Sequence, residues 1–202
     1  MRLYNSQVSG NCYKVRLVAA QLGLELELVE LDVIDRSDRP DVLGGLNPAL
    51  RVPTLVLDDG RPLGESGAIM LYLADGTALV PADRFERAQM MQWMFFEQYD
   101  LEPNIAVARF WLSVSGTPER WADQLPAKQE AGHRTLDAIE RHLADRTFLV
   151  GERYTLADIA LYGYTHVAEE GGFDMSRYPA TRAWLERVRS QPGHVTMAGE
   201  PA

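Results

Sequence analysis

The chain has 202 residues, 46% of them hydrophobic and 24% charged, a composition that favours a protein with sizeable buried cores and excludes a largely disordered one. Its formal net charge of -9 disfavours nucleic acid and anionic membranes as partners, because both are polyanions. This length fits one large domain or two small ones.

Short apolar runs alternate with helical patterns over residues 1–78. Extended segments are predicted at RLYN, LELELVEL, VPTLVL and just after Gly60, and helices from about Cys12, near Pro40 and from Ser66. The order is β-α-β-α-β-β-α, which predicts a small mixed α/β domain. The first two strands, joined by a helix, should be parallel, whereas Asp59-Gly60 predicts a tight hairpin between the last two.

After a predicted linker at 79–83, the sequence at 84–202 indicates an all-helical second domain. The helix expected from Arg84 to about Tyr99 is apolar around most of its circumference, which indicates cover on several sides, from a partner subunit or a pocket wall. Two further helix starts are predicted where a threonine can cap the helix, at Thr117-Pro118 and at Thr155 with Asp158. Tyr178-Pro179 is predicted to start the last helix, and Pro126 to interrupt a helix or begin one.

The stretch QVSGNCYKVRL places Ser9, Asn11 and Cys12 together at the start of the first helix. Ser9 and Asn11 are expected to precede its first turn, where backbone N–H groups and the helix dipole favour an anion such as a thiolate. A simple capping role for either residue is the alternative. Cys12 should point inward, because it shares one apolar helix face with Val15, Ala19 and Leu22.

Two more segments suit a ligand. Pro53 stands at the start of the strand VPTLVL, where it removes one N–H without breaking a ladder, and a cis bond there would turn the backbone of Val52 toward a ligand. Ser66 begins a helix and can bind a carboxylate, while Glu65 beside it can accept hydrogen bonds from an ammonium group. Together Glu65 and Ser66 suit the head group of an α-amino acid. Taken alone, Ser66 would be interpreted as an ordinary helix N-cap.

The sequence has one cysteine, which excludes an internal disulfide and agrees with a reducing compartment. Its first residues do not resemble a secretion signal and no run approaches the length of a membrane span, so we expect a cytoplasmic protein that does not enter a membrane. The four histidines lack metal-ligand spacing, and we expect no metal.

These motifs, in this order, resemble a soluble glutathione transferase of the bacterial serine or asparagine type: S-x-N at a helix start, N-P-x-x-x-V-P, E-S before a third helix, and T-L-A-D-I in a helical second half. The resemblance spans essentially the whole chain. It implies a thioredoxin-like first domain that binds glutathione as co-substrate, a helical domain with the second-substrate site and much of the dimer contact, and a homodimer.

The resemblance also implies roles for individual residues. Val52 should pair its backbone with the cysteinyl part of glutathione, with Pro53 cis, and Glu65 and Ser66 should hold the γ-glutamyl end. Arg51 matches a basic position near the glycyl carboxylate, a task that Arg39 could share. The second-substrate pocket has weaker candidates, for which helix packing is the competing interpretation: Phe96, Tyr99, Arg109, Phe110 and Trp111.

Ser9 falls where serine-type members place the hydroxyl that activates the thiol, and Asn11 resembles the asparagine of nu-type members that contacts the sulfur. Both are predicted catalytic residues. The redox motif C-x-x-C is Ser9-x-x-Cys12 here, so Cys12 is interpreted as core. The predicted activity is transfer of glutathione to an electrophilic small molecule; the alternatives are nu-like disulfide reduction with glutathione, a zeta- or theta-type isomerase or dehalogenase, and a non-catalytic scaffold of the same fold.

Overall fold

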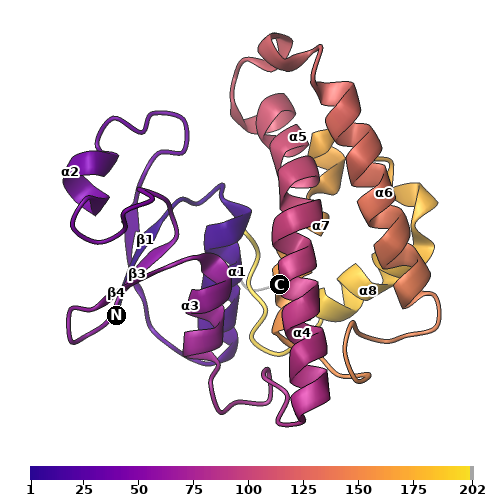
Figure 1. Cartoon of the computed structure of the whole chain (residues 1–202), viewed down its shortest axis with the longest axis horizontal. Helices are drawn as coiled ribbons and strands as arrows, with labels where there is room; N and C mark the ends of the chain where they lie inside the picture. The colour runs from indigo at the N-terminus through magenta and orange to yellow at the C-terminus, as the bar shows by residue number, and fades with distance from the viewer. Residues whose placement is uncertain (201–202) are drawn as a thin grey trace. The chain divides into compact units, whose positions relative to one another are not determined.

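The structure is a computed structural model that describes residues 1–200. Its contacts divide the chain into two compact units (Figure 1). The N-terminal unit comprises Met1–Thr77 and the C-terminal segment that begins at Pro192, and the helical unit comprises Ala78–Gln191. The structure differs here from our expectation that the helical domain extends to the end of the chain.

The N-terminal unit contains one four-stranded sheet in the order β2-β1-β3-β4. The β1–β2 pair is parallel and the β3–β4 pair is antiparallel, which confirms both predictions. β1 also pairs antiparallel with β3. The elements follow the predicted order: β1 (Arg2–Asn5), α1 (Gly10–Gln21), β2 (Glu27–Glu30), α2 (Arg39–Leu43), β3 (Thr54–Val56), β4 (Pro62–Gly64) and α3 (Ser66–Leu73).

The core of this unit lies between the sheet and the pair α1 and α3, which pack side by side (Figure 1). Leu3 and Leu55, directly opposite each other on β1 and β3, are fully buried. α1 contributes a run of buried side chains from Cys12 to Ala19, so the prediction that Cys12 points inward is confirmed. Burial of apolar area of this kind is the main stabilising term of such a unit.

The C-terminal segment joins the N-terminal unit through hydrogen bonds to α1 and to the loop before it. The Tyr13 hydroxyl donates to the carbonyl of Val195 at 2.8 Å, and Arg16 Nη1 and Gln7 Nε2 donate to the carbonyl of Met197 at 2.9 and 2.6 Å. Gly193 has φ +71° and lies against the backbone of α1, where a Cβ would come within 3.0 Å of an α-carbon. No local pattern in the sequence reveals these long-range contacts.

The helical unit contains the remaining helices, among which α7 is buried along its whole length. Its elements are α4 (Arg84–Phe96), the π-helix η1 (Glu97–Ala106), α5 (Val107–Arg109), the π-helix η2 (Phe110–Val114), the 3-10 helix η3 (Pro118–Trp121), α6 (Leu125–Leu143), α7 (Leu156–Thr165), the 3-10 helices η4 (Ala168–Gly171) and η5 (Met175–Arg177), and α8 (Pro179–Arg189).

The predicted helix starts of this unit have different outcomes. Thr155 and Asp158 form the predicted capping box of α7, and Pro179 opens α8 as predicted. Thr117, by contrast, makes no side-chain capping bond, and the helix that follows is a single 3-10 turn. The helix predicted to end near Tyr99 ends at Phe96, where the chain continues as η1. Pro103, which has no N–H to donate, lies inside this π-helix.

Within residues 1–200, no group of three or more His, Cys, Asp and Glu side chains is arranged to hold a metal ion. In the same part of the chain, no helix combines the length and the apolar character needed to span a bilayer.

Candidate functional site

Ser9 follows β1 and caps α1. Its hydroxyl oxygen accepts from the backbone N–H of Cys12 at 3.3 Å, and the Ser9 side chain also hydrogen-bonds to the Cys12 sulfur. The preceding loop is held from several sides: the N–H of Ser6 donates to the Cys12 sulfur at 3.3 Å, and the N–H of Gln7 donates to Glu30. Ser9 therefore places a hydroxyl donor at the positive end of a helix that is fixed in the core.

Asn11 lies inside the first turn of α1, one residue beyond its start, and not before the helix as expected. Its Oδ1 accepts from Lys14 Nζ at 2.8 Å and from the Ser66 hydroxyl at 3.2 Å. Two donors at one oxygen identify that end of the amide as the acceptor, so the opposite end carries the two N–H donors. The Ser66 contact joins residues 55 positions apart in the sequence.

Glu65 and Ser66 connect β4 to α3. Ser66 is buried at the start of α3, whereas the Glu65 side chain is exposed. Glu65 has φ +63° and ψ +117°, a conformation that residues with a side chain rarely adopt. Such backbone strain is concentrated at ligand-binding and active sites, and here it turns the chain sharply between the strand and the positive end of α3.

Val52 and Pro53 are joined by a cis peptide bond, the isomer that the family resemblance implies. Asn47 Nδ2 braces this loop through the Arg51 carbonyl at 3.2 Å and the Thr54 hydroxyl at 2.8 Å. Within residues 1–200, no protein group hydrogen-bonds to the backbone N–H or C=O of Val52. Because backbone polar groups need partners, Val52 presents an edge to which another peptide backbone can bind.

The two predicted arginines lie in different environments. Arg39 is buried and braces the chain: Nη1 donates to the carbonyl of Leu50 at 3.1 Å and Nη2 to that of Asp32 at 2.8 Å. Arg51 is exposed beside Val52. Arg39 thus shapes the loop that precedes Val52, and Arg51 is the better placed of the two to meet a carboxylate from solvent.

Cys12 is fully buried, and burial raises the pKa of its thiol to about 11. A thiol with that pKa is protonated at neutral pH and is a poor nucleophile. The cluster at the start of α1 therefore carries donor groups on Ser9 and Asn11 and lacks a reactive protein thiolate of its own.

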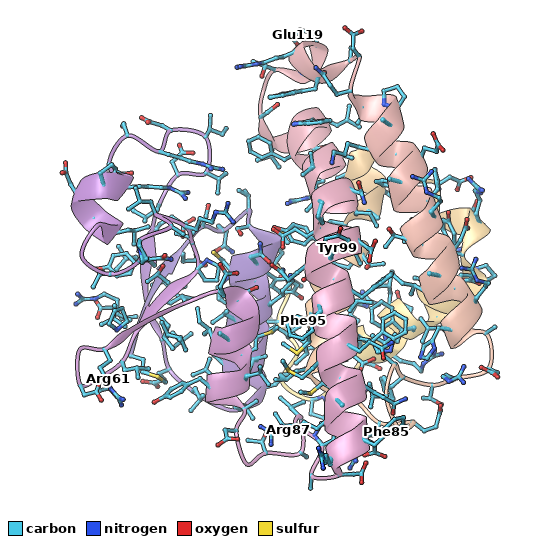
Figure 2. The ribbon with its side chains drawn as sticks, in the orientation of Figure 1. Arg61, Phe85, Arg87, Phe95, Tyr99 and Glu119 are labelled. Carbon is cyan, nitrogen blue, oxygen red and sulfur yellow. The ribbon has the colours of Figure 1, made fainter. Side chains whose placement is uncertain are left out.

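The candidates for a second-substrate pocket are dispersed in the helical unit. Arg109 is buried in an ion pair with Glu170 at 2.7 Å, and Trp111 stacks on Trp121 with ring centroids 4.8 Å apart. Phe96 packs edge-on against Trp93, and Phe110 is partly buried. Tyr99 alone is largely exposed (Figure 2), with 83% of its surface accessible. Helix packing accounts for Arg109, Trp111 and Phe96.

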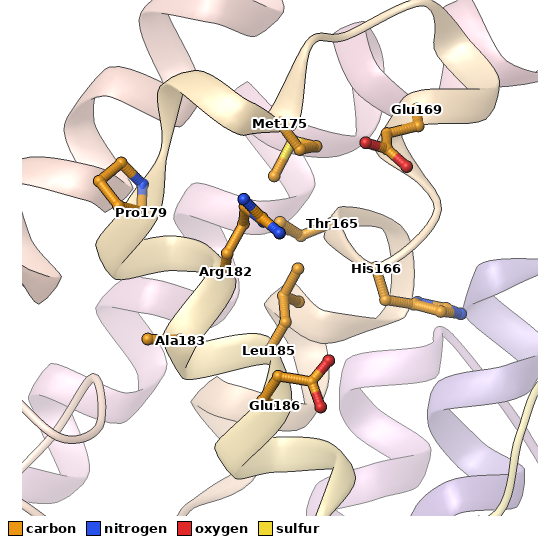
Figure 3. A pocket seen from close by; sticks show the side chains of 9 residues that line it. All are labelled: Thr165, His166, Glu169, Met175, Pro179, Arg182, Ala183, Leu185 and Glu186. Atoms are coloured by element: carbon orange, nitrogen blue, oxygen red, sulfur yellow. The ribbon is translucent and has the colours of Figure 1, made fainter.

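A cavity of about 410 Å³ in the helical unit is lined by none of these candidates. Arg182 and Glu186 of α8 and Glu169 of η4 give it a polar wall, and Met175 and Leu185 contribute apolar atoms (Figure 3). No sequence motif singled out these residues. Lys14 was not predicted either; its one signal was a basic residue three positions after Asn11 on the same helix.

Comparisons with known proteins match segments of both units. Residues 3–79 match the N-terminal domain model of glutathione S-transferases and residues 104–192 the C-terminal domain model. A crystal structure of a glutathione S-transferase from Pseudomonas fluorescens [Pf-5] is 45% identical with a TM-score of 0.94, covering 97% of this chain and 98% of that one.

Curated relatives of similar length include glutathione S-transferase 3 of Zea mays, 32% identical over 205 residues, which span 95% of this chain and 90% of that protein. Another is the disulfide-bond oxidoreductase YfcG of Escherichia coli (strain K12), 30% identical over 190 residues, which span 90% of this chain and 87% of that protein. The thioredoxin-like N-terminal unit, the helical unit and these similarities lead to one conclusion: the chain belongs to the glutathione S-transferase family.

Proposed function

We propose that the protein binds glutathione on its N-terminal unit and uses Ser9 and Asn11 to hold the sulfur as a thiolate that attacks an electrophilic small molecule. The observation that carries this proposal is the hydrogen bond between the Ser66 hydroxyl and Asn11 Oδ1 at 3.2 Å, because it brings the starts of α1 and α3 together. Two positive helix ends then lie within reach of one small, negatively charged ligand.

The tripeptide fits the remaining features of the site. The backbone of Val52 can pair with the cysteinyl residue of glutathione, and Ser66 can donate to the γ-glutamyl carboxylate. The exposed carboxylate of Glu65 can accept from the γ-glutamyl ammonium. Arg51 can pair with the glycyl carboxylate, while Arg39 acts indirectly by shaping the loop.

Ionisation of the glutathione thiol is the step to which the protein contributes. Hydrogen bonds from Ser9 and Asn11 stabilise the charged sulfur relative to the thiol, and one pK unit of stabilisation corresponds to about 1.36 kcal/mol, which a single hydrogen bond to a charged group can supply. The thiolate then forms a carbon–sulfur bond, the leaving group departs with its electron pair, and the thiol proton passes to solvent.

The test is a pH titration of the thiolate absorbance of bound glutathione in wild type, Ser9→Ala and Asn11→Ala. We expect each substitution to raise the pKa of the bound thiol by roughly one unit, because each removes a donor to the anion. Calorimetry should show that both variants still bind glutathione, since the γ-glutamyl and backbone contacts persist. Unchanged titrations in both variants would contradict the proposed role.

Disulfide reduction is a second candidate function, favoured by the similarity to the disulfide-bond oxidoreductase YfcG and by the burial of Cys12. With no reactive protein thiol at this site, the bound glutathione thiolate would attack a disulfide sulfur and release one thiolate. A second glutathione would then resolve the mixed disulfide, giving oxidised glutathione and a second thiol. Rates on chlorodinitrobenzene and on bis(hydroxyethyl) disulfide, measured side by side, distinguish the two functions.

A scaffold without catalysis and a glutathione-dependent isomerase or dehalogenase are the remaining alternatives. A scaffold has no need for donors arranged around a sulfur position, and binding of glutathione without turnover on either substrate class would favour it. Among the described residues, those around the cavity in the helical unit do not point to a specific metabolic substrate.

A further inference from the structure

Lys14 is a fully buried lysine in the N-terminal unit. It lies on α1 one turn after Asn11, and its residue surface is 0% exposed. Burial of an ammonium group is costly unless polar partners compensate, so a lysine at this place requires an explanation. The chain has one other lysine, Lys128, which lies partly exposed on α6 of the helical unit.

One partner of Lys14 is a residue of the candidate site, Asn11. Lys14 Nζ donates to Asn11 Oδ1 at 2.8 Å, closer than the 3.2 Å of the Ser66 hydroxyl to the same oxygen. Ser66 has a single hydroxyl hydrogen, and that hydrogen leaves Asn11 when it turns to a carboxylate of the ligand. Lys14 has three N–H donors, so one of them can stay on the Asn11 amide in the loaded site.

The charge of Lys14 has a second consequence for the sulfur. An ammonium at Oδ1 polarises the Asn11 amide and strengthens the N–H donors at its opposite end. A positive charge in a poorly solvated place also favours a nearby anion. The other charged groups of this region are engaged elsewhere: Arg16 binds Gln7 and Met197, and Glu30 binds Asn5 and Gln7, while Glu65 is exposed.

We propose, on the basis of the function proposed above, that Lys14 is a positioning residue for thiolate formation: its buried ammonium fixes the Asn11 amide with the N–H groups toward the sulfur and favours the ionised sulfur through its charge. Lys14 does not touch the reacting atoms in this arrangement. It acts through Asn11.

The experiment compares wild type, Lys14→Met and Lys14→Gln in pH titrations of the thiolate absorbance of bound glutathione. Methionine fills similar space without charge or donor, and glutamine keeps a donor without charge. We expect the pKa of the bound thiol to rise by roughly 0.5 to 1 unit in Lys14→Met and by less in Lys14→Gln. The rate at saturating glutathione at pH 6.5 should fall roughly three- to tenfold in Lys14→Met, with little change in KM for glutathione.

Lys128→Met is the matched control, because it removes the other lysine from a different unit; its titration should follow wild type. Circular dichroism spectra and glutathione calorimetry confirm that each variant is folded and loaded. A titration of Lys14→Met that superimposes on wild type overturns the assignment of Lys14 while leaving the glutathione site intact. If wild-type protein neither binds glutathione nor ionises its thiol, the proposed function itself fails.

Discussion

The family resemblance implies that Ser9 and Cys12 fall at the two positions where thioredoxin-fold redox proteins carry cysteines, and the environments of the two residues differ sharply. The Ser9 hydroxyl caps α1, whereas Cys12 is enclosed in the core with a thiol pKa raised to about 11. Under the proposed function, the chemistry of this site therefore depends on a sulfur that the ligand brings.

Substitution of Cys12 should leave glutathione chemistry intact. In Cys12→Ala we expect a wild-type pKa for the bound glutathione thiol and full activity on either substrate class, because the protein thiol is neutral and buried. Labelling by a thiol reagent at pH 8 should be slow in the folded protein and rapid after denaturation. Rapid labelling of folded protein, or loss of the glutathione thiolate in the variant, would refute this view.

The same thiol gives a pH dependence of stability. In the unfolded chain the thiol ionises near the ordinary cysteine pKa of 9.0, while the folded one keeps its proton to about pH 11. The folded state binds more protons in this range, so the free energy of unfolding contributed by Cys12 should fall as pH rises from 9 to 11. The comparison is with Cys12→Ala, whose denaturation curves should lose less stability over the same range.

We expect the Glu65 carboxylate to bind the ligand, while the backbone of this residue is held in a strained conformation. In Glu65→Gly the relief of the positive φ and the greater flexibility of glycine in the unfolded chain should nearly cancel, leaving the free energy of unfolding within about 1 kcal/mol of wild type. Glutathione affinity should fall about tenfold with the loss of the carboxylate.

Glu152, which also has a positive φ and lies in the helical unit, provides the control. Glu152→Gly makes the same backbone change in the helical unit and leaves the N-terminal unit unaltered, so calorimetry should record wild-type affinity for glutathione. Equal affinity in Glu65→Gly and wild type would remove the Glu65 carboxylate from the binding site.

Helix α7 is stabilised by hydrogen bonds at its N-terminus. The Thr155 hydroxyl accepts from the N–H of Ala157 at 3.3 Å, and Asp158 accepts from the N–H groups of Thr155 and Leu149 at 2.9 and 3.1 Å and from the Trp184 indole at 2.9 Å. The capping box thus joins α7 to α8 and to the preceding loop in the core of the helical unit.

Replacement by alanine of the two threonines predicted to start helices, Thr155 and Thr117, should change the free energy of unfolding by different amounts. Thr155→Ala should lower the free energy of unfolding by about 1 to 2 kcal/mol, because a buried cap is lost. Thr117→Ala should change it by less than about 0.5 kcal/mol, because Thr117 makes no capping bond. Chemical denaturation measures both variants, and equal losses would show that the distinction between the two helix starts is wrong.

The exposed apolar side chains of α4 and η1 are relevant to the oligomeric state of the protein. Phe85, Phe95 and Tyr99 are exposed along these helices (Figure 2), with Phe95 64% accessible. Apolar side chains exposed in this way often mark protein interfaces.

We expect a homodimer that uses this surface. Phe95→Glu places a charge on it and should shift the sedimentation coefficient toward that of a monomer, whereas Arg61→Glu, at the exposed β3–β4 turn, should leave the assembly unchanged. A monomeric wild type, or a dimer indifferent to Phe95→Glu, would contradict the expected interface.

The sequence by itself determined the features that local chemistry controls. Asp59-Gly60 predicted the hairpin, the helix between the first strands predicted their parallel pairing, and Thr155 with Asp158 predicted a capping box, since each depends on residues a few positions apart. The linear order of the glutathione transferase motifs likewise sufficed to indicate the family.

Only the tertiary structure decided features that depend on contacts between distant segments. The Ser66 hydroxyl reaches Asn11 because α1 and α3 pack together, and the C-terminal segment folds back on Tyr13 and Arg16 through bonds that span more than 180 positions. Burial of Lys14 on Asn11 also follows from this packing. Side-chain patterns report local backbone preference, whereas burial and long-range hydrogen bonds are set by how the elements pack, which no short stretch of sequence encodes.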